Sequence, residues 1–144
     1  MVEIDKSALD MDARLVDDIG RGDALAWEEF VRRYTGWALY GAGRWCEKHC
    51  PHRFAVMECG IKSVSIRVAA EEKAWAPKYR PGNSGAEECD EGMDTYIWIM
   101  EQLRKRIMRY TGRNSSRLST FVWRVLNSKE LYVDWLRWKY GRVF

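Results

Sequence analysis

The sequence lacks any long apolar run, and it has only three prolines and two histidines. A membrane-spanning helix needs about 20 mainly apolar residues, so no membrane association is expected. The N-terminal stretch MVEIDKSALDMDARLVDD is acidic and has neither the basic head nor the apolar centre of a secretory signal peptide. We therefore expect a soluble cytoplasmic protein whose four cysteines are reduced thiols and not disulfides.

Signatures of catalysis are also missing. The glycine-containing stretch GRGDALAW, residues 20–27, lacks the Lys-Ser/Thr ending of a phosphate-binding loop. No local signature supports a Ser/His/Asp or Cys/His catalytic arrangement. We therefore expect that the chain is not an enzyme.

Positive charge and aromatic rings are concentrated in the C-terminal third. Residues 1–94 carry 13 Lys and Arg against 18 Asp and Glu, whereas residues 95–144 carry 11 against 3. Ten of the 19 aromatic residues also lie in residues 95–144. This asymmetry favours a polyanionic partner for the C-terminal segment, although a plain solvated face has the same composition.

The spacing of apolar residues predicts an all-α fold, a compact bundle of four to five helices in a single domain, residues 1–144. The expected helices cover residues 12–19, 23–46, 90–110 and 117–140. Asp23 is a good N-cap for the second helix. The third helix is expected to bury a stripe at spacings of three and four residues, formed by Met93, Ile97, Met100, Leu103 and Ile107.

The fourth helical stretch follows the polar loop RNSS, in which Ser115 or Ser116 can cap the helix. Asn127 and Ser128 are weak helix formers, so we expect a bend or a break there. Before the bend, the expected stripe is Leu118, Phe121, Val122 and Val125; after it, Tyr132, Trp135 and Leu136.

An irregular insertion, residues 47–89, separates the second and third helices and contains all three prolines. Within it, KSVSIRVAAEEKAW (62–75) alternates like a strand at first, but we expect a short helix. The four cysteines, with two histidines among them, could hold a structural zinc ion as Cys46, Cys50, Cys59 and Cys89. A redox-sensing thiol pair and ordinary buried cysteines are the alternatives, because the Cys-x3-Cys spacing is not the tight zinc knuckle.

Three motifs, in this order, resemble one bacterial family: GDALAWEEFVRRY, CDEGMDTYIWIMEQL and SSRLSTFVWRVLNSKELYVDWLRWKYGR. Together they are similar to the second conserved region of RNA polymerase sigma factors of the extracytoplasmic-function type, over about 75 of the 144 residues. Met93 replaces the usual Gln of the second motif, and the interval from Arg124 to Asp134 is about two residues longer than usual. We expect residues 1–144 to lack the domain that reads the upstream promoter element in that family.

The resemblance implies two binding surfaces. Its second motif would bind a basic coiled coil of the largest subunit of core RNA polymerase through Asp90, Asp94, Tyr96, Ile97 and Glu101. Its third motif would recognise and melt the promoter element near position −10 and hold it as single-stranded DNA. The residues expected to bind DNA are Arg113, Arg117, Trp123, Arg124, Asn127, Ser128, Lys129, Arg137, Trp138 and Lys139. An anti-sigma factor is a further candidate partner.

Simpler interpretations remain for each of these features. Carboxylates at the start of a helix commonly stabilise its dipole. Tyr132 and Trp135 fit a core stripe, whereas Trp138 lies off that stripe beside two cations, and Asn127 and Ser128 could serve as loop caps. For the whole chain, the alternatives to a sigma-factor-like domain are a polymerase-binding regulator and a zinc-stapled protein adaptor, neither of which melts promoters.

Overall fold

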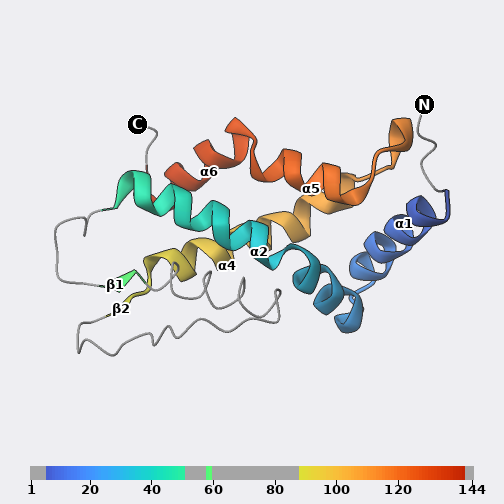
Figure 1. Ribbon diagram of the computed structural model, residues 1–144, viewed down its shortest axis with the longest axis horizontal. Coiled ribbons are helices and arrows are strands. Elements are labelled where there is room, and N and C mark those ends of the chain that lie inside the picture. Colours follow the sequence, from blue (N-terminus) through green and yellow to red (C-terminus); the bar gives the residue numbers. More distant parts are fainter. Residues whose placement is uncertain (1–5, 51–57, 60–87, 142–144) are drawn as a thin grey trace, which may run out of the picture. The chain divides into compact units, whose positions relative to one another are not determined.

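The computed structural model describes residues 6–50, 58–59 and 88–141, which form α-helices, short 3-10 turns and one two-residue strand pair (Figure 1). The all-α prediction is confirmed. The α-helices in the described part are α1 (Lys6–Gly20), α2 (Ala24–His49), α4 (Glu91–Arg106), α5 (Leu118–Leu126) and α6 (Lys129–Tyr140). The strands β1 (Glu58–Cys59) and β2 (Glu88–Cys89) pair in parallel. The short helix expected at 62–75 lies outside the described residues.

The chain divides into two compact units, which are residues 1–34 with 100–144, and residues 35–99. In the first unit, α1, the start of α2, the end of α4 and both C-terminal helices supply buried apolar side chains. These include Leu15, Val16, Ile19, Phe30, Leu103, Ile107, Leu118, Val122, Leu131 and Trp135. No helix in the described ranges combines the length and apolarity that crossing a bilayer requires.

The second unit joins the C-terminal half of α2 to the start of α4. Thr35 and Tyr96 share a hydrogen bond of 2.6 Å between their hydroxyl oxygens. The Sγ atom of Cys46 donates to Oγ1 of the buried Thr95 at 3.7 Å. These side-chain contacts fix the face of α4 that turns inward.

The stripe predicted for the third helix is confirmed in its second half, wrong at Ile97, and half-buried at Met93. Met100, Leu103 and Ile107 are buried, but Ile97 is 52% exposed. Thr95 and Ile99 are buried in its place. A spacing of three and four residues is compatible with burial of Ile97 or of Thr95 and Ile99. The hydrogen bonds of Thr95 and Tyr96 to α2 show that Thr95 and Ile99 face inward.

The start of α2 forms as expected. Oδ1 of Asp23 accepts from the backbone N–H of Leu25 at 2.9 Å and of Ala26 at 3.3 Å. A carboxylate in this position satisfies N–H groups that have no partner within the helix. The prediction of Asp23 as N-cap is therefore confirmed.

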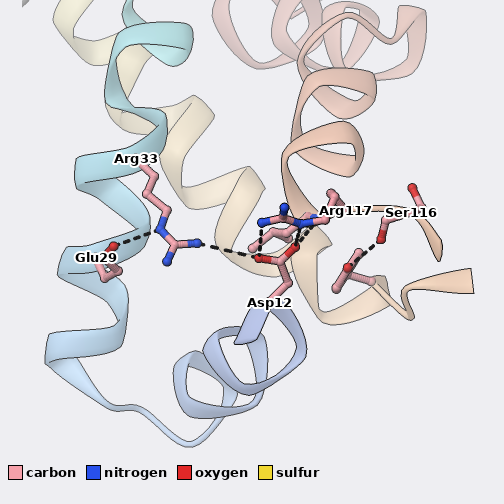
Figure 2. Close-up of polar contacts among 7 residues, drawn as sticks. Asp12, Glu29, Arg33, Ser116 and Arg117 are labelled. Atoms are coloured by element: carbon pink, nitrogen blue, oxygen red, sulfur yellow. Dashed lines mark hydrogen bonds and ion pairs between the residues drawn. The ribbon is translucent and has the colours of Figure 1, made fainter. Parts of the chain in front are cut away.

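The start of α5 is held differently from the prediction, by a carboxylate from another helix (Figure 2). Asp12 of α1 accepts from the backbone N–H of Leu118 at 3.0 Å through Oδ2. The N-cap residue, Arg117, makes no side-chain cap bond of its own. Ser115 and Ser116 do not cap α5: the backbone of Ser115 has a positive φ of 57°, and the carbonyl of Ser116 accepts from the hydroxyl of Tyr110 at 2.7 Å.

The bend predicted at Asn127 and Ser128 is confirmed, because α5 ends at Leu126 and α6 begins at Lys129. The Oγ atom of Ser128 accepts from the N–H of Leu131 at 3.2 Å and donates to the carbonyl of Val125 at 2.7 Å. One serine thus bonds to the last turn of α5 and caps the start of α6.

Candidate nucleic-acid interface

The exposed face of α5 carries an aromatic ring beside a cation. Leu118 and Val122 face the core, and Trp123, with 56% of its surface exposed, lies next to the exposed Arg124. Asn127 follows one turn later and donates through Nδ2 to the carbonyl of Trp123 at 2.9 Å. A large apolar ring held toward solvent can stack on a base, and an exposed guanidinium on the same helix can contact a phosphate.

The following helix, α6, repeats this arrangement. Trp138 is 48% exposed and follows the exposed Arg137. Lys139 is half-buried, with its ammonium 6.0 Å from the ring centroid of Tyr140, whereas Lys129 at the start of the helix is exposed. The helix therefore presents a second exposed tryptophan and a second exposed arginine, which are adjacent in the sequence.

The other aromatic residues of α6 belong to the core. Trp135 is fully buried, and the half-buried Tyr132 stacks on it with ring centroids 6.0 Å apart. The interpretation as a core stripe is therefore confirmed for Trp135, whereas Tyr132 lies at the edge of the core. Trp123 and Trp138 are the aromatic side chains of α5 and α6 that stand out as exposed.

Two of the residues expected to bind DNA make side-chain contacts that hold the fold together. The Nε atom of Arg117 donates to Oδ2 of Asp12 at 2.6 Å, and Nη2 donates to Oδ1 at 3.4 Å. This hydrogen bond raises the pKa of Arg117. Ser128 is the N-cap of α6. Arg113, in contrast, is exposed in the 3-10 turn after Gly112.

Asp12 is the centre of an ion-pair network that sequence reasoning missed (Figure 2). Its side chain is 2% exposed, and Nη1 of Arg33 approaches Oδ1 at 3.8 Å. Nε of Arg33 donates in turn to Oε1 of Glu29 at 2.9 Å. The sequence could have indicated this network, because Asp12 lies on the same face of α1 as Leu15, Val16 and Ile19. A carboxylate buried on that face needs a partner.

A second missed network lies on α6. Nη1 of Arg106 donates to Oε1 of Glu130 at 3.1 Å, and Nη2 donates to Oδ2 of Asp134 at 2.7 Å. We call these three residues the Arg106 fork. It ties the end of α4 to the first two turns of α6.

No family model matches this chain. Comparisons with curated proteins and with solved structures also find no match.

The candidate polymerase-binding residues lie on α4 and just before it. Asp90, Asp94, Ile97 and Glu101 are all exposed. Their spacing of three to four residues places them along one side of the helix. Tyr96, in contrast, is half-buried and bonds to Thr35, so it holds α4 against α2.

The structure describes the side chains of three of the four proposed zinc ligands, Cys46, Cys50 and Cys89. Cys46 bonds to Thr95, and Sγ of Cys89 donates to Oε2 of Glu91 at 3.7 Å. Among the side chains that the structure describes, no group of three or more His, Cys, Asp or Glu is placed to hold a metal ion. The side chain of Cys59 lies outside the described residues, although its backbone pairs in register with that of Cys89.

Proposed function

We propose that this chain is a sigma-factor-like domain that binds core RNA polymerase and holds the −10 promoter element as single-stranded DNA. The observation that carries the proposal is the exposure of Trp123 and Trp138, each adjacent in the sequence to an exposed arginine, on two consecutive helices. The resemblance of the three sequence motifs to sigma factors supports the choice of promoter DNA as the ligand.

A protein that holds an opened DNA strand must replace the base stacking that the strand has lost, and it must neutralise the charge of its phosphates. An aromatic face supplies about 1–3 kcal/mol per stacked base, and a cationic groove follows the phosphates. Unpairing each base costs a few kcal/mol, so two rings flanked by cations can offset much of the cost of opening a short segment. Trp123 with Arg124 and Trp138 with Arg137 provide these contacts.

The exposed side of α4 is the proposed polymerase contact. Asp90, Asp94 and Glu101 supply negative charge, and Ile97 supplies an exposed apolar side chain between them. Acidic side chains around an apolar contact suit a basic partner surface, because the charges direct association and the apolar contact contributes affinity.

Separate variants test the two surfaces. Trp123→Ala should weaken binding of a fluorescently labelled single-stranded −10 oligonucleotide by roughly five- to 100-fold, the equivalent of one stacked base. The same variant should still be captured by core polymerase. Trp37→Ala, which removes another partly exposed tryptophan on α2, is the matched control and should bind the oligonucleotide normally.

The reverse pattern is expected from Asp90→Lys with Asp94→Lys. Capture by core polymerase should fall, while oligonucleotide affinity stays the same or rises. Asp10→Lys with Asp17→Lys, two exposed aspartates on α1, controls for the same change in net charge. Should both sets of variants lose the same activity, the division between the two surfaces is wrong. A wild-type chain that binds polymerase but not DNA would instead be a polymerase-binding regulator.

A further inference from the structure

The basic C-terminal segment contains two acidic side chains that should repel a DNA strand. Residues 102–144 hold eleven Lys and Arg but only Glu130 and Asp134 as acids. Both lie on α6, one helical turn apart, and Asp134 comes three residues before Arg137. An unpaired carboxylate there would lie within a Debye length of any phosphate bound by that arginine.

Both carboxylates are engaged by one guanidinium. Arg106 reaches Glu130 at 3.1 Å and Asp134 at 2.7 Å, and its side chain is only 15% exposed. A guanidinium presents several N–H donors in a rigid plane, so it can bond two carboxylates at once, which a lysine ammonium does less well. The Arg106 fork therefore places one partly buried cation against both acids of α6.

Arg106 and Arg137 compete for the same carboxylate. Oδ2 of Asp134 accepts from Arg106 at 2.7 Å, whereas Oδ1 lies 4.0 Å from Nη1 of Arg137, at the outer limit of an ion pair. The side chain of Arg137 remains 65% exposed. Without Arg106, Asp134 would lose its close partner, and Arg137 could move in to replace it.

We propose that Arg106 is a positioning residue that keeps Arg137 available to a DNA phosphate. It does so by holding Asp134 in a close ion pair and by neutralising Glu130. The inference rests on the proposed function, in which the exposed face of α6 binds a single strand. Arg106 itself, largely buried beside α6, need not touch the DNA.

Thermal unfolding of the full chain tests the competition without any DNA. Arg137→Gln should leave the melting temperature of the wild-type chain nearly unchanged, because its contact with Asp134 is long. In an Arg106→Gln background the same change should lower the melting temperature, because Arg137 has become the partner of Asp134. Equal effects of Arg137→Gln in the two backgrounds would overturn the competition.

Binding of a fluorescein-labelled single-stranded oligonucleotide, followed by anisotropy over a range of salt concentrations, tests the consequence. Arg106→Gln should weaken binding about three- to tenfold, and the slope of log affinity against log salt should become shallower by about 0.7, the value for one lost phosphate contact. Arg106→Gln with Asp134→Asn should return to within about twofold of wild type, because nothing then captures Arg137. Arg106→Lys should lie in between.

Circular dichroism of each variant establishes that the helices are intact. A folded double variant that still binds as weakly as Arg106→Gln would overturn the inference, as would a normal affinity and salt slope for Arg106→Gln. Failure of the proposed function looks different: the wild-type chain itself would not bind the oligonucleotide. The inference about DNA then falls with it, while the melting temperatures still decide whether the two arginines compete for Asp134.

Discussion

Replacing Asp12 with alanine removes the carboxylate that joins α1 to the start of α5. Three N–H groups would lose a close acceptor: Nε and Nη2 of Arg117 and the backbone N–H of Leu118. Breaking a fully buried ion pair costs about 3–5 kcal/mol, and losing an N-cap about 0.5–2 kcal/mol. Arg117 is 42% exposed and can regain water, which reduces the first contribution. We therefore expect a loss of about 2–4 kcal/mol in the free energy of unfolding.

Urea denaturation, followed by the far-ultraviolet circular dichroism of the helices, measures this loss of stability. At about 3 °C per kcal/mol for a chain of this size, the melting temperature should fall by roughly 6–12 °C. Asp12→Asn keeps an oxygen for Leu118 and should lose less. Asp17→Ala, an exposed change on the same helix, is the control and should have little effect.

Double-mutant analysis separates the ion pair from the cap. Once Asp12 is alanine, Arg117→Ala should cost little more, because its main partner is already gone. The cost should then be clearly less than additive. A stability of Asp12→Ala equal to that of Asp17→Ala, or full additivity with Arg117→Ala, would refute the idea that this buried carboxylate holds α5 in place.

Three further outcomes follow from the local geometry. Ser128→Ala should lower the free energy of unfolding by about 1 kcal/mol by removing the cap of α6, whereas Ser128→Asp should largely preserve it; equal stability of all three chains in urea would contradict the cap. Gly112→Ala should cost about 1 kcal/mol, because φ is +69° there, and an unchanged urea midpoint would argue against that conformation. Burial and the nearby Asp12 raise the pKa of Tyr34, so its stabilising contribution is complete below about pH 10 and is lost as pH rises through the higher folded-state value. Melting temperatures between pH 8 and 11 should therefore fall less steeply for Tyr34→Phe than for wild type, and parallel curves would contradict this.

Local sequence signals predicted those features that depend on neighbouring residues. Asp23 as a cap, the break at Asn127 and Ser128, and the burial of Trp135 each follow from spacing or propensity within a few residues. The exposure of Trp138 was also expected, because it lies off the core stripe of its helix.

Features that depend on distant residues could not be predicted in this way. The acceptor at the start of α5 comes from Asp12, 106 positions earlier than Leu118. A local serine was the natural expectation, and a buried remote carboxylate replaced it. The inward face of α4 was likewise predicted wrongly at Ile97, because the contacts of Thr95 and Tyr96 with α2 decide which residues turn inward.

The same reasoning applies to the candidate site. Sequence alone grouped all the cations of residues 113–139 as one surface. The structure assigns Arg117 to Asp12 and leaves Arg124 and Arg137 exposed beside Trp123 and Trp138. An ion pair across the fold changes which cations can meet a ligand, and spacing along the chain carries no information about it.

The most direct measurement of the central claim is permanganate reactivity of promoter thymines in the presence of core RNA polymerase. Unstacked thymines near position −10 should become reactive when the wild-type chain is added, and should remain unreactive with Trp123→Ala. Trp37→Ala should behave as wild type. Reactivity that is absent with the wild-type chain, or equally strong with Trp123→Ala, would contradict the claim that the exposed rings of α5 and α6 hold opened DNA.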